Sequence, residues 1–172
     1  MTTLLLVRHG ETDWNAEGRL QGQTDRPLND FGRRQAARLA DELEGEAISA
    51  VWSSDLSRAR ETAEILAARL GLEVQVDPGL REKNWGTWEG LTGEERDRVE
   101  FVGESTEAHR DRTLAALRRI CELHPGETVL VVTHGGSLRR VQAAVLGVAL
   151  PVAENCGRWP VVHEDGIFRA VD

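Results

Sequence analysis

The sequence predicts an α/β fold, a three-layer αβα sandwich in which a mostly parallel sheet is flanked by helices. Short apolar runs alternate along the chain with longer segments of helical periodicity. The runs are apolar on both faces, which is typical of strands buried in a parallel sheet. Because the 172 residues contain no repeat and no Pro/Ser-rich linker, we expect one domain over residues 1–172, with a short inserted cap at about residues 83–105.

The first half of the chain alternates between strand and helix patterns. The predicted elements are a strand at residues 4–7, a helix at 31–43, a strand at 48–52, a helix at 56–70 and a strand at 72–76. The first helix follows Asn29, a residue type that caps helix N-termini, and repeats alanine and leucine at helical spacing. Gly71 suits the left-handed position that ends a helix, and a turn at Asp77-Pro78-Gly79 ends the third strand.

The second half continues the alternation. The predicted elements are a helix at residues 106–124, a strand at 128–132, a helix at 137–146 and one or two edge strands within 161–171. Gly147 and Pro151 follow the last helix and stop it, and Asp165-Gly166 forms the turn of the edge strands. We assign the charged run at 94–100 to a solvated helix of the cap, and Ser105 to the N-cap of the next helix.

Composition and charge argue against several classes of function. The net charge is −8 at pH 7, which opposes binding to nucleic acid or another polyanion. Two cysteines, Cys121 and Cys156, are too few for a disulfide framework and lie in no zinc-binding spacing. The apolar run before Arg8 is too short for a signal peptide or a membrane span. We therefore expect a cytoplasmic protein with no nucleic acid and no membrane among its partners.

Charged and polar residues follow the predicted strands. In chain order they are Arg8 and His9 after the first strand, Arg58 after the second, Glu82 after the third and His134 after the fourth. In an open α/β sheet, ligands bind beyond the carboxyl ends of the strands. We therefore expect two imidazoles, two guanidiniums and one carboxylate to meet at this edge of the sheet.

These residue types suit phosphoryl transfer. Guanidiniums bind phosphate oxygens through a fixed fork of donors. Nearby cations lower the pKa of an imidazole, which keeps the ring neutral and nucleophilic at pH 7. An alkoxide is a poor leaving group, so a carboxylic acid is needed to protonate it and afterwards to activate water. Glu82 is the candidate for both steps.

A resemblance to a known family rests on five segments. In this order, LLLVRHGETDWN, RLQGQTDRPLNDFGRRQA, SSDLSRARETA, LREKNWGTWEG and VVTHGG resemble the histidine phosphatase superfamily, the phosphoglycerate-mutase-like proteins. The resemblance implies that family's parallel-rich sheet with flanking helices and an inserted cap. It also implies a phosphoric monoester hydrolase of the phosphatase branch, which works without a metal or an organic cofactor on a small phosphorylated metabolite.

The resemblance further implies roles for individual residues. His9 corresponds to the nucleophile that becomes phosphorylated and Glu82 to the proton donor. The phosphate-binding positions correspond to Arg8, Arg58 and His134. Positions in or near the substrate pocket correspond to Asn15, Gln21, Gly22, Thr12, Lys83 and Gly135. A homodimer stays open as the oligomeric state.

Two departures from the family bear on the substrate, and the first of them, a missing insertion, favours a phosphatase over a mutase. Mutase relatives carry a long insertion after the position of Glu82, with two arginines for the glycerate carboxylate, whereas about two dozen residues separate Glu82 from the next predicted helix here. Lys83-Asn84-Trp85 stands where phosphatases often have Ile-Asp-Phe. Lys83 occupies the place of a mutase arginine and is available to hold an acidic substrate. Sugar phosphates, glycerate phosphates, nucleotide fragments, cofactor intermediates and phosphoproteins remain candidate substrates.

Three alternatives stay open at this point. One is phosphoryl transfer of the phosphoglycerate mutase type. Another is a zinc hydrolase with His9, His134 and Glu82 as ligands, which two neighbouring arginines disfavour. The third is a non-catalytic protein that binds a phosphorylated ligand.

Residues outside the matched motifs are assigned to structure. His109, His124 and His163 lack motif context and are expected at the surface. Trp85 is close to Glu82 in the sequence, which makes pocket lining and ordinary packing equally reasonable for its ring.

Overall fold

The sheet predicted from the alternating pattern is present. The computed structural model describes residues 1–171 and contains a six-stranded sheet in the order β3-β2-β4-β1-β5-β6. Its strands are β1 (Thr2–Arg8), β2 (Ala50–Ser53), β3 (Val74–Val76), β4 (Thr128–Thr133), β5 (Arg158–Glu164) and β6 (Ile167–Ala170). The first four strands pair in parallel, and β5 and β6 add an antiparallel edge. The predicted α/β class with a mostly parallel sheet is confirmed.

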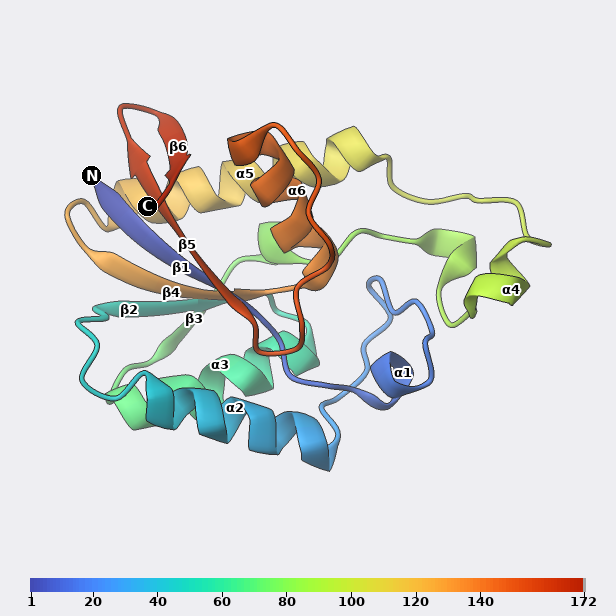
Figure 1. Ribbon diagram of the computed structural model, residues 1–172, viewed down its shortest axis with the longest axis horizontal. Coiled ribbons are helices and arrows are strands. Elements are labelled where there is room, and N and C mark those ends of the chain that lie inside the picture. Colours follow the sequence, from blue (N-terminus) through green and yellow to red (C-terminus); the bar gives the residue numbers. More distant parts are fainter. Residues whose placement is uncertain (172) are drawn as a thin grey trace.

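Helices cover both faces of this sheet. In Figure 1, α2 (Asp30–Glu42) and α3 (Ser57–Leu70) lie below it, and α5 (Thr106–Leu123) and α6 (Gly135–Leu146) lie above it. The layers are those of the predicted αβα sandwich. Within residues 1–171, none of the helices combines the length and the apolar content that crossing a membrane would require.

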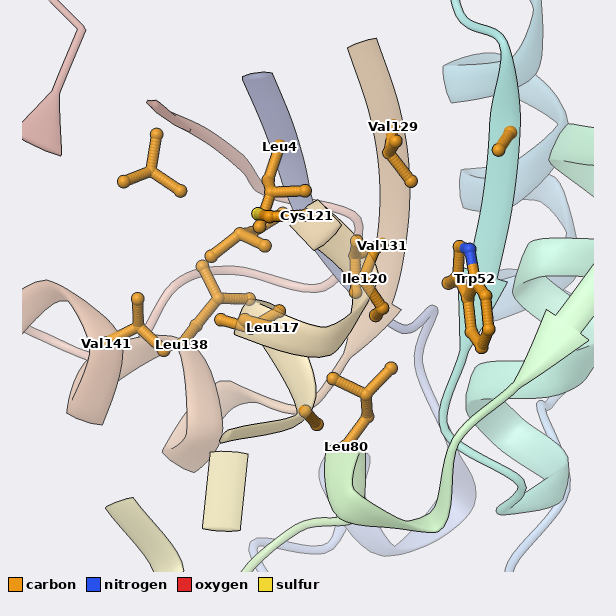
Figure 2. Close-up of a cluster of buried hydrophobic side chains, with 14 residues drawn as sticks. Leu4, Trp52, Leu80, Leu117, Ile120, Cys121, Val129, Val131, Leu138 and Val141 are labelled. Atoms are coloured by element: carbon orange, nitrogen blue, oxygen red, sulfur yellow. The ribbon is translucent and has the colours of Figure 1, made fainter. Parts of the chain in front are cut away.

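Period-two alternation along the central strands fills a core on each face. In β4, Val129 and Val131 belong to the cluster between the sheet and helices α5 and α6. Leu130 and Val132 belong to the cluster between the sheet and helices α2 and α3. Figure 2 shows the first cluster, to which α5 contributes Leu117. These side chains are buried, and full burial of a large apolar side chain stabilises a fold by roughly 1.5–3 kcal/mol. The packing therefore fixes β4 and the residues that follow its end.

The helix boundaries follow local signals in the sequence. The side chains of Asn29 and Ser105 accept hydrogen bonds from backbone N–H groups three residues ahead, at 2.7 and 3.0 Å. Gly71 ends α3 in the left-handed region, with φ at 69°. All three predicted caps are confirmed.

The segment between β3 and α5 consists of short turns. It contains η1 (Pro78–Leu80), η2 (Gly86–Trp88) and α4 (Gly93–Arg96), so the solvated helix predicted at residues 94–100 is a single turn that begins one residue earlier. In Figure 1 this segment extends to the right, away from the sheet and on the same side as α1 (Asp13–Ala16).

Backbone hydrogen bonds tie the inserted segment to the loop after α1. Leu20 donates to the carbonyl of Leu91 at 3.1 Å and accepts from the N–H of Gly90 at 2.7 Å. Three aromatic rings pack within the segment, with the centroids of Trp88 and Phe101 4.9 Å apart and Trp85 6.1 Å from each. The two loops therefore form one wall beside the carboxyl end of the sheet.

Candidate active site

The carboxyl ends of the central strands open into a cavity of about 210 Å³. Arg8 at the end of β1 pairs with Thr133 at the end of β4, so His9 and His134 leave the sheet side by side. The residues that line the cavity come from these strand ends, α1 and the loop after it, the inserted segment, the first turns of α3, α5 and α6, and the loop after α6. They are Arg8, His9, Asn15, Arg19, Leu20, Gln21, Gly22, Arg58, Glu82, Lys83, Trp85, Thr106, His109, Gly135, Gly136, Arg139, Arg140 and Val152. Every predicted site residue belongs to this group except His134 and Thr12.

His9 is a buried, neutral imidazole at the cavity. Its Nδ1 lies 2.7 Å from the carbonyl oxygen of Gly10, which can only accept a hydrogen bond, so Nδ1 carries the hydrogen and Nε2 keeps its lone pair. Burial lowers the pKa of His9 well below its ordinary value of 6.5, and the charges of Arg58 and Arg8 lower it further. The ring is therefore neutral at neutral pH, and its unprotonated Nε2 is nucleophilic.

His134 lies beside His9 and is fully buried. The two ring centroids are 5.2 Å apart. Nε2 of His134 lies 2.9 Å from Oγ of Ser54, whereas Nδ1 is buried with no hydrogen-bond partner among residues 1–171. Burial lowers the pKa of His134 well below 6.5, with Arg58 as the largest charge effect. The ring therefore stays neutral and has one nitrogen free for a ligand.

Arg58 supplies a buried positive charge. Its Nη2 donates to the carbonyl of Gly22 at 2.6 Å and its Nη1 to that of Thr24 at 3.1 Å. Burial lowers the pKa of Arg58 to about 10, so the guanidinium remains charged at neutral pH. Within residues 1–171 its Nε has no partner. The side chain is thus fixed by carbonyls while part of its donor fork stays available.

Arg8 approaches the cavity from the end of β1. Its Nη1 donates to the carbonyl of Ala153 at 2.6 Å, and its Nε is buried without a partner among the described residues 1–171. Burial lowers the pKa of Arg8, although the charge of Glu82 acts in the opposite direction. Two guanidiniums with unused donors beside neutral imidazoles form an anion-binding environment.

Glu82 is held by two backbone N–H groups at the cavity. Oε1 accepts from the N–H of Lys83 at 2.8 Å, and Oε2 accepts from the N–H of Gly136 at 2.9 Å. A side chain at Gly136 would collide with the Glu82 carboxylate, so the close approach requires glycine. The helix predicted at 137–146 starts earlier, at Gly135 with His134 as its N-cap, and this first turn provides the donor.

Three further predicted residues, Thr12, Asn15 and Gln21, form a polar network at α1. Oγ1 of Thr12 donates to Oε1 of Gln21 at 2.7 Å, and the N–H of Thr12 donates to Oδ1 of Asn15 at 3.1 Å. Thr12 is buried behind the cavity and caps α1, so it supports the site without lining it. Gly22 has φ at 55°, a left-handed conformation, and its carbonyl holds Arg58.

The surface assignment of His109 is wrong. Its side chain is 1% exposed and lines the cavity from the first turns of α5. It shares one face of α5 with the buried Thr113, Ala116 and Ile120, which recur at helical spacing, and this face packs against the sheet. That spacing was readable in the sequence and would have placed the histidine inside. The other two histidines assigned to the surface, His124 and His163, are half-buried.

Further residues at the cavity were not among the predicted site residues. They are Arg19, Leu20, Thr106, Gly136, Arg139, Arg140 and Val152. Trp85, for which packing and pocket lining were equally reasonable, lines the cavity. Arg139 and Arg140 follow the HGG segment by about one helical turn. Because α6 begins at Gly135, that spacing places both arginines near the cavity.

The alternative zinc site would need at least three metal-binding side chains close together. Within residues 1–171, no three His, Cys, Asp or Glu side chains lie close enough to hold a metal ion.

Comparison of the sequence with known proteins gives a family match. Residues 4–158 match the family model of the histidine phosphatase superfamily (branch 1). Phosphoglycerate mutase-like protein 4 of Arabidopsis thaliana is 45% identical over 155 residues, which cover 79% of this chain and 67% of the relative. The metal-independent phosphoserine phosphatase of Arabidopsis thaliana is 39% identical over 187 residues, or 95% and 76% of the two chains. The probable phosphoglycerate mutase GpmB of Escherichia coli O1:K1 is 40% identical over 193 residues, or 99% and 89%.

Solved structures agree with the sequence match. Bacillus stearothermophilus YhfR superposes with a TM-score of 0.92 at 34% identity and covers 99% of this chain and 95% of its own. A mutant phosphoserine phosphatase of Entamoeba histolytica in complex with phosphoserine gives a TM-score of 0.87 at 28% identity, with coverage of 100% and 96%. The shared fold and the match over residues 4–158 lead to one conclusion: this chain belongs to branch 1 of the histidine phosphatase superfamily.

Proposed function

We propose that the protein is a metal-independent phosphatase that hydrolyses a small phosphomonoester through a phosphohistidine at His9. The observation that carries this proposal is the neutral, buried His9 ring, whose Nδ1 is bound to a carbonyl and whose pKa is lowered by burial and by two guanidiniums. Such a ring offers an unprotonated Nε2 next to groups that bind a phosphate.

The reaction has two displacements at phosphorus. In the first, Nε2 of His9 bonds to phosphorus while the bond from phosphorus to the leaving oxygen breaks, and Glu82 gives its proton to that oxygen. In the second, Glu82 takes a proton from water, the hydroxide oxygen bonds to phosphorus, and the bond to Nε2 breaks. Inorganic phosphate leaves, and both side chains return to their starting states.

Arg8, Arg58 and His134 stabilise the charge on the transferred group. Both arginines have buried donors that residues 1–171 leave unused. When the Ser54 hydroxyl donates to Nε2 of His134, Nδ1 carries the ring's hydrogen and can donate it to a phosphoryl oxygen. Phosphoryl transfer depends largely on positioning and on this kind of electrostatic stabilisation. Asn15 and Gln21 line the same cavity and complete its polar wall.

Further cations at the cavity support a finer proposal, that the substrate carries a second anionic group. Lys83, Arg139 and Arg140 line the cavity, and none of them takes part in the ion pairs found within residues 1–171. Burial and the charge of Arg140 lower the pKa of Lys83, which indicates two cations near each other. Phosphoserine, the ligand named with the Entamoeba histolytica structure, is a phosphomonoester with a carboxylate.

The mutase alternative is less well supported. The segment between Glu82 and α5 holds two short turns of helix and lacks the long insertion that the family resemblance attributes to mutases. Relatives named as probable mutases keep this alternative relevant. Formation of 2-phosphoglycerate from 3-phosphoglycerate, in place of free phosphate, would favour it.

Replacing the nucleophile tests the mechanism. We expect His9→Ala to abolish phosphate release from a panel of phosphorylated metabolites, because no other group at the cavity takes over bond formation to phosphorus. A colorimetric phosphate assay measures the rate, and circular dichroism measures the fold. His163→Ala, on the antiparallel edge of the sheet, is the matched control and should keep its activity. Undiminished hydrolysis by folded His9→Ala would refute the mechanism.

Leaving-group dependence tests Glu82. We expect Glu82→Gln to slow an alkyl phosphate by about 10²–10⁴-fold, the usual contribution of general acid catalysis. An aryl phosphate should lose much less in its first step, because its leaving group needs no proton. Single-turnover rates with both esters measure that step. Equal losses for the two esters would remove Glu82 from the role of acid.

Paired substrates test the second anionic group. We expect Arg140→Gln to reduce kcat/KM about tenfold for 3-phosphoglycerate and little for glycerol 3-phosphate, since the two esters differ by a carboxylate that a guanidinium binds. Steady-state kinetics with both esters give the ratio. Arg34→Gln, an exposed arginine on α2, is the control for lost positive charge. If Arg140→Gln affects both esters alike, the proposed anion subsite is wrong.

A further inference from the structure

His109 is a buried polar side chain that the mechanism above leaves unused. It is 1% exposed and sits on the face of α5 that otherwise packs apolar groups against the sheet. Its Nδ1 is buried without a hydrogen-bond partner among residues 1–171. Burying an imidazole with an unpartnered nitrogen costs stability that an apolar side chain would avoid, so the position calls for a functional reason.

The contacts of His109 lead to Glu82. Nε2 of His109 lies 2.9 Å from Oγ of Ser137 and 3.7 Å from Oε1 of Glu82. Ser137 donates its hydroxyl hydrogen to the carbonyl of Arg81, at 3.2 Å. The hydroxyl oxygen therefore accepts from His109, which places the imidazole hydrogen on Nε2, the nitrogen that faces the carboxylate.

Burial keeps the His109 ring neutral. Burial lowers its pKa from 6.5; Arg112 and Arg140 also lower it, and Glu82 and Glu104 act in the opposite direction. The ring therefore stays neutral at neutral pH, with its Nε2–H directed at Ser137 and its Nε2 3.7 Å from Oε1 of Glu82.

We propose that His109 is a positioning residue for the acid: with Ser137, it holds the Glu82 carboxylate in the orientation that delivers a proton to the leaving group. This inference rests on the proposed function, in which Glu82 is the acid. Oε1 accepts from the N–H of Lys83 and lies 3.7 Å from Nε2 of His109, outside hydrogen-bond distance, whereas Oε2 accepts from the N–H of Gly136. Each backbone N–H holds one oxygen, and the neighbouring His109 ring limits rotation of the carboxylate.

The test compares leaving groups in variants of His109. We expect His109→Leu to lower the single-turnover rate with an alkyl phosphate about tenfold, part of the 10²–10⁴-fold effect of the acid, and to leave an aryl phosphate within about twofold. KM should stay within about twofold, because His109 acts through Glu82. His109→Gln, which offers an amide N–H at a similar reach, should restore most of the alkyl rate.

Controls separate positioning from packing. Thr113→Ala changes the next buried residue on the same face of α5 and should move neither rate. Ser137→Ala removes the group that orients the imidazole, and we expect it to lower the alkyl rate several-fold with the aryl rate unchanged. If His109→Leu does not fold, the alkyl and aryl rates of Ser137→Ala test the positioning role in its place.

The outcomes distinguish this inference from the proposed function. A normal alkyl-to-aryl ratio in folded His109→Leu, together with a collapsed ratio in Glu82→Gln, overturns the role of His109 and leaves the acid in place. A normal ratio in Glu82→Gln itself overturns the proposed acid. Equal losses on both esters in His109→Leu without rescue by His109→Gln indicate a packing role and also overturn the inference.

Discussion

The whole site depends on burying two guanidiniums next to two imidazoles. Burying a charged group costs free energy, and this cost shifts the pKa of each buried group by a different amount. Arg58 stays protonated even though burial lowers its pKa to about 10, whereas His9 and His134 remain neutral because burial and the arginines oppose a further positive charge. The result is a positive pocket with an unprotonated nitrogen, which a phosphate dianion complements in charge.

The scaffold supports this arrangement through elements far apart in the chain. The parallel register of β1 and β4 sets the spacing between His9 and His134. The left-handed turn at Gly22 supplies a carbonyl that holds Arg58, and the first turn of α6 supplies the N–H of Gly136 that holds Glu82. Arg58 and Glu82 are therefore fixed by backbone groups, which cannot change rotamer, whereas His134 is held by the hydroxyl of Ser54.

The sequence predicted those features that depend on periodicity or on a motif. The strand-helix alternation predicted the sandwich, because apolar runs and helical spacing reflect burial directly. The position after a strand predicted that Arg8, His9, Arg58 and Glu82 would meet at one edge of the sheet, where they line the cavity. What escaped prediction depends on tertiary proximity. Arg139 and Arg140 reach the cavity because α6 begins at Gly135, and the helix start was placed two residues late. His109 was judged by its missing motif, although its helical spacing with Thr113 and Ala116 indicated burial.

The most direct measurement is chemical trapping of the intermediate. The protein is mixed with a ³²P-labelled phosphomonoester, quenched in base within a turnover and digested, and the labelled peptide is sequenced. The account predicts label on His9 that survives base and is lost in acid, the behaviour of a phosphorylated imidazole, and no such label in His9→Ala. Steady hydrolysis without label on His9 at any quench time, or label on another side chain, would contradict a phosphohistidine at this position.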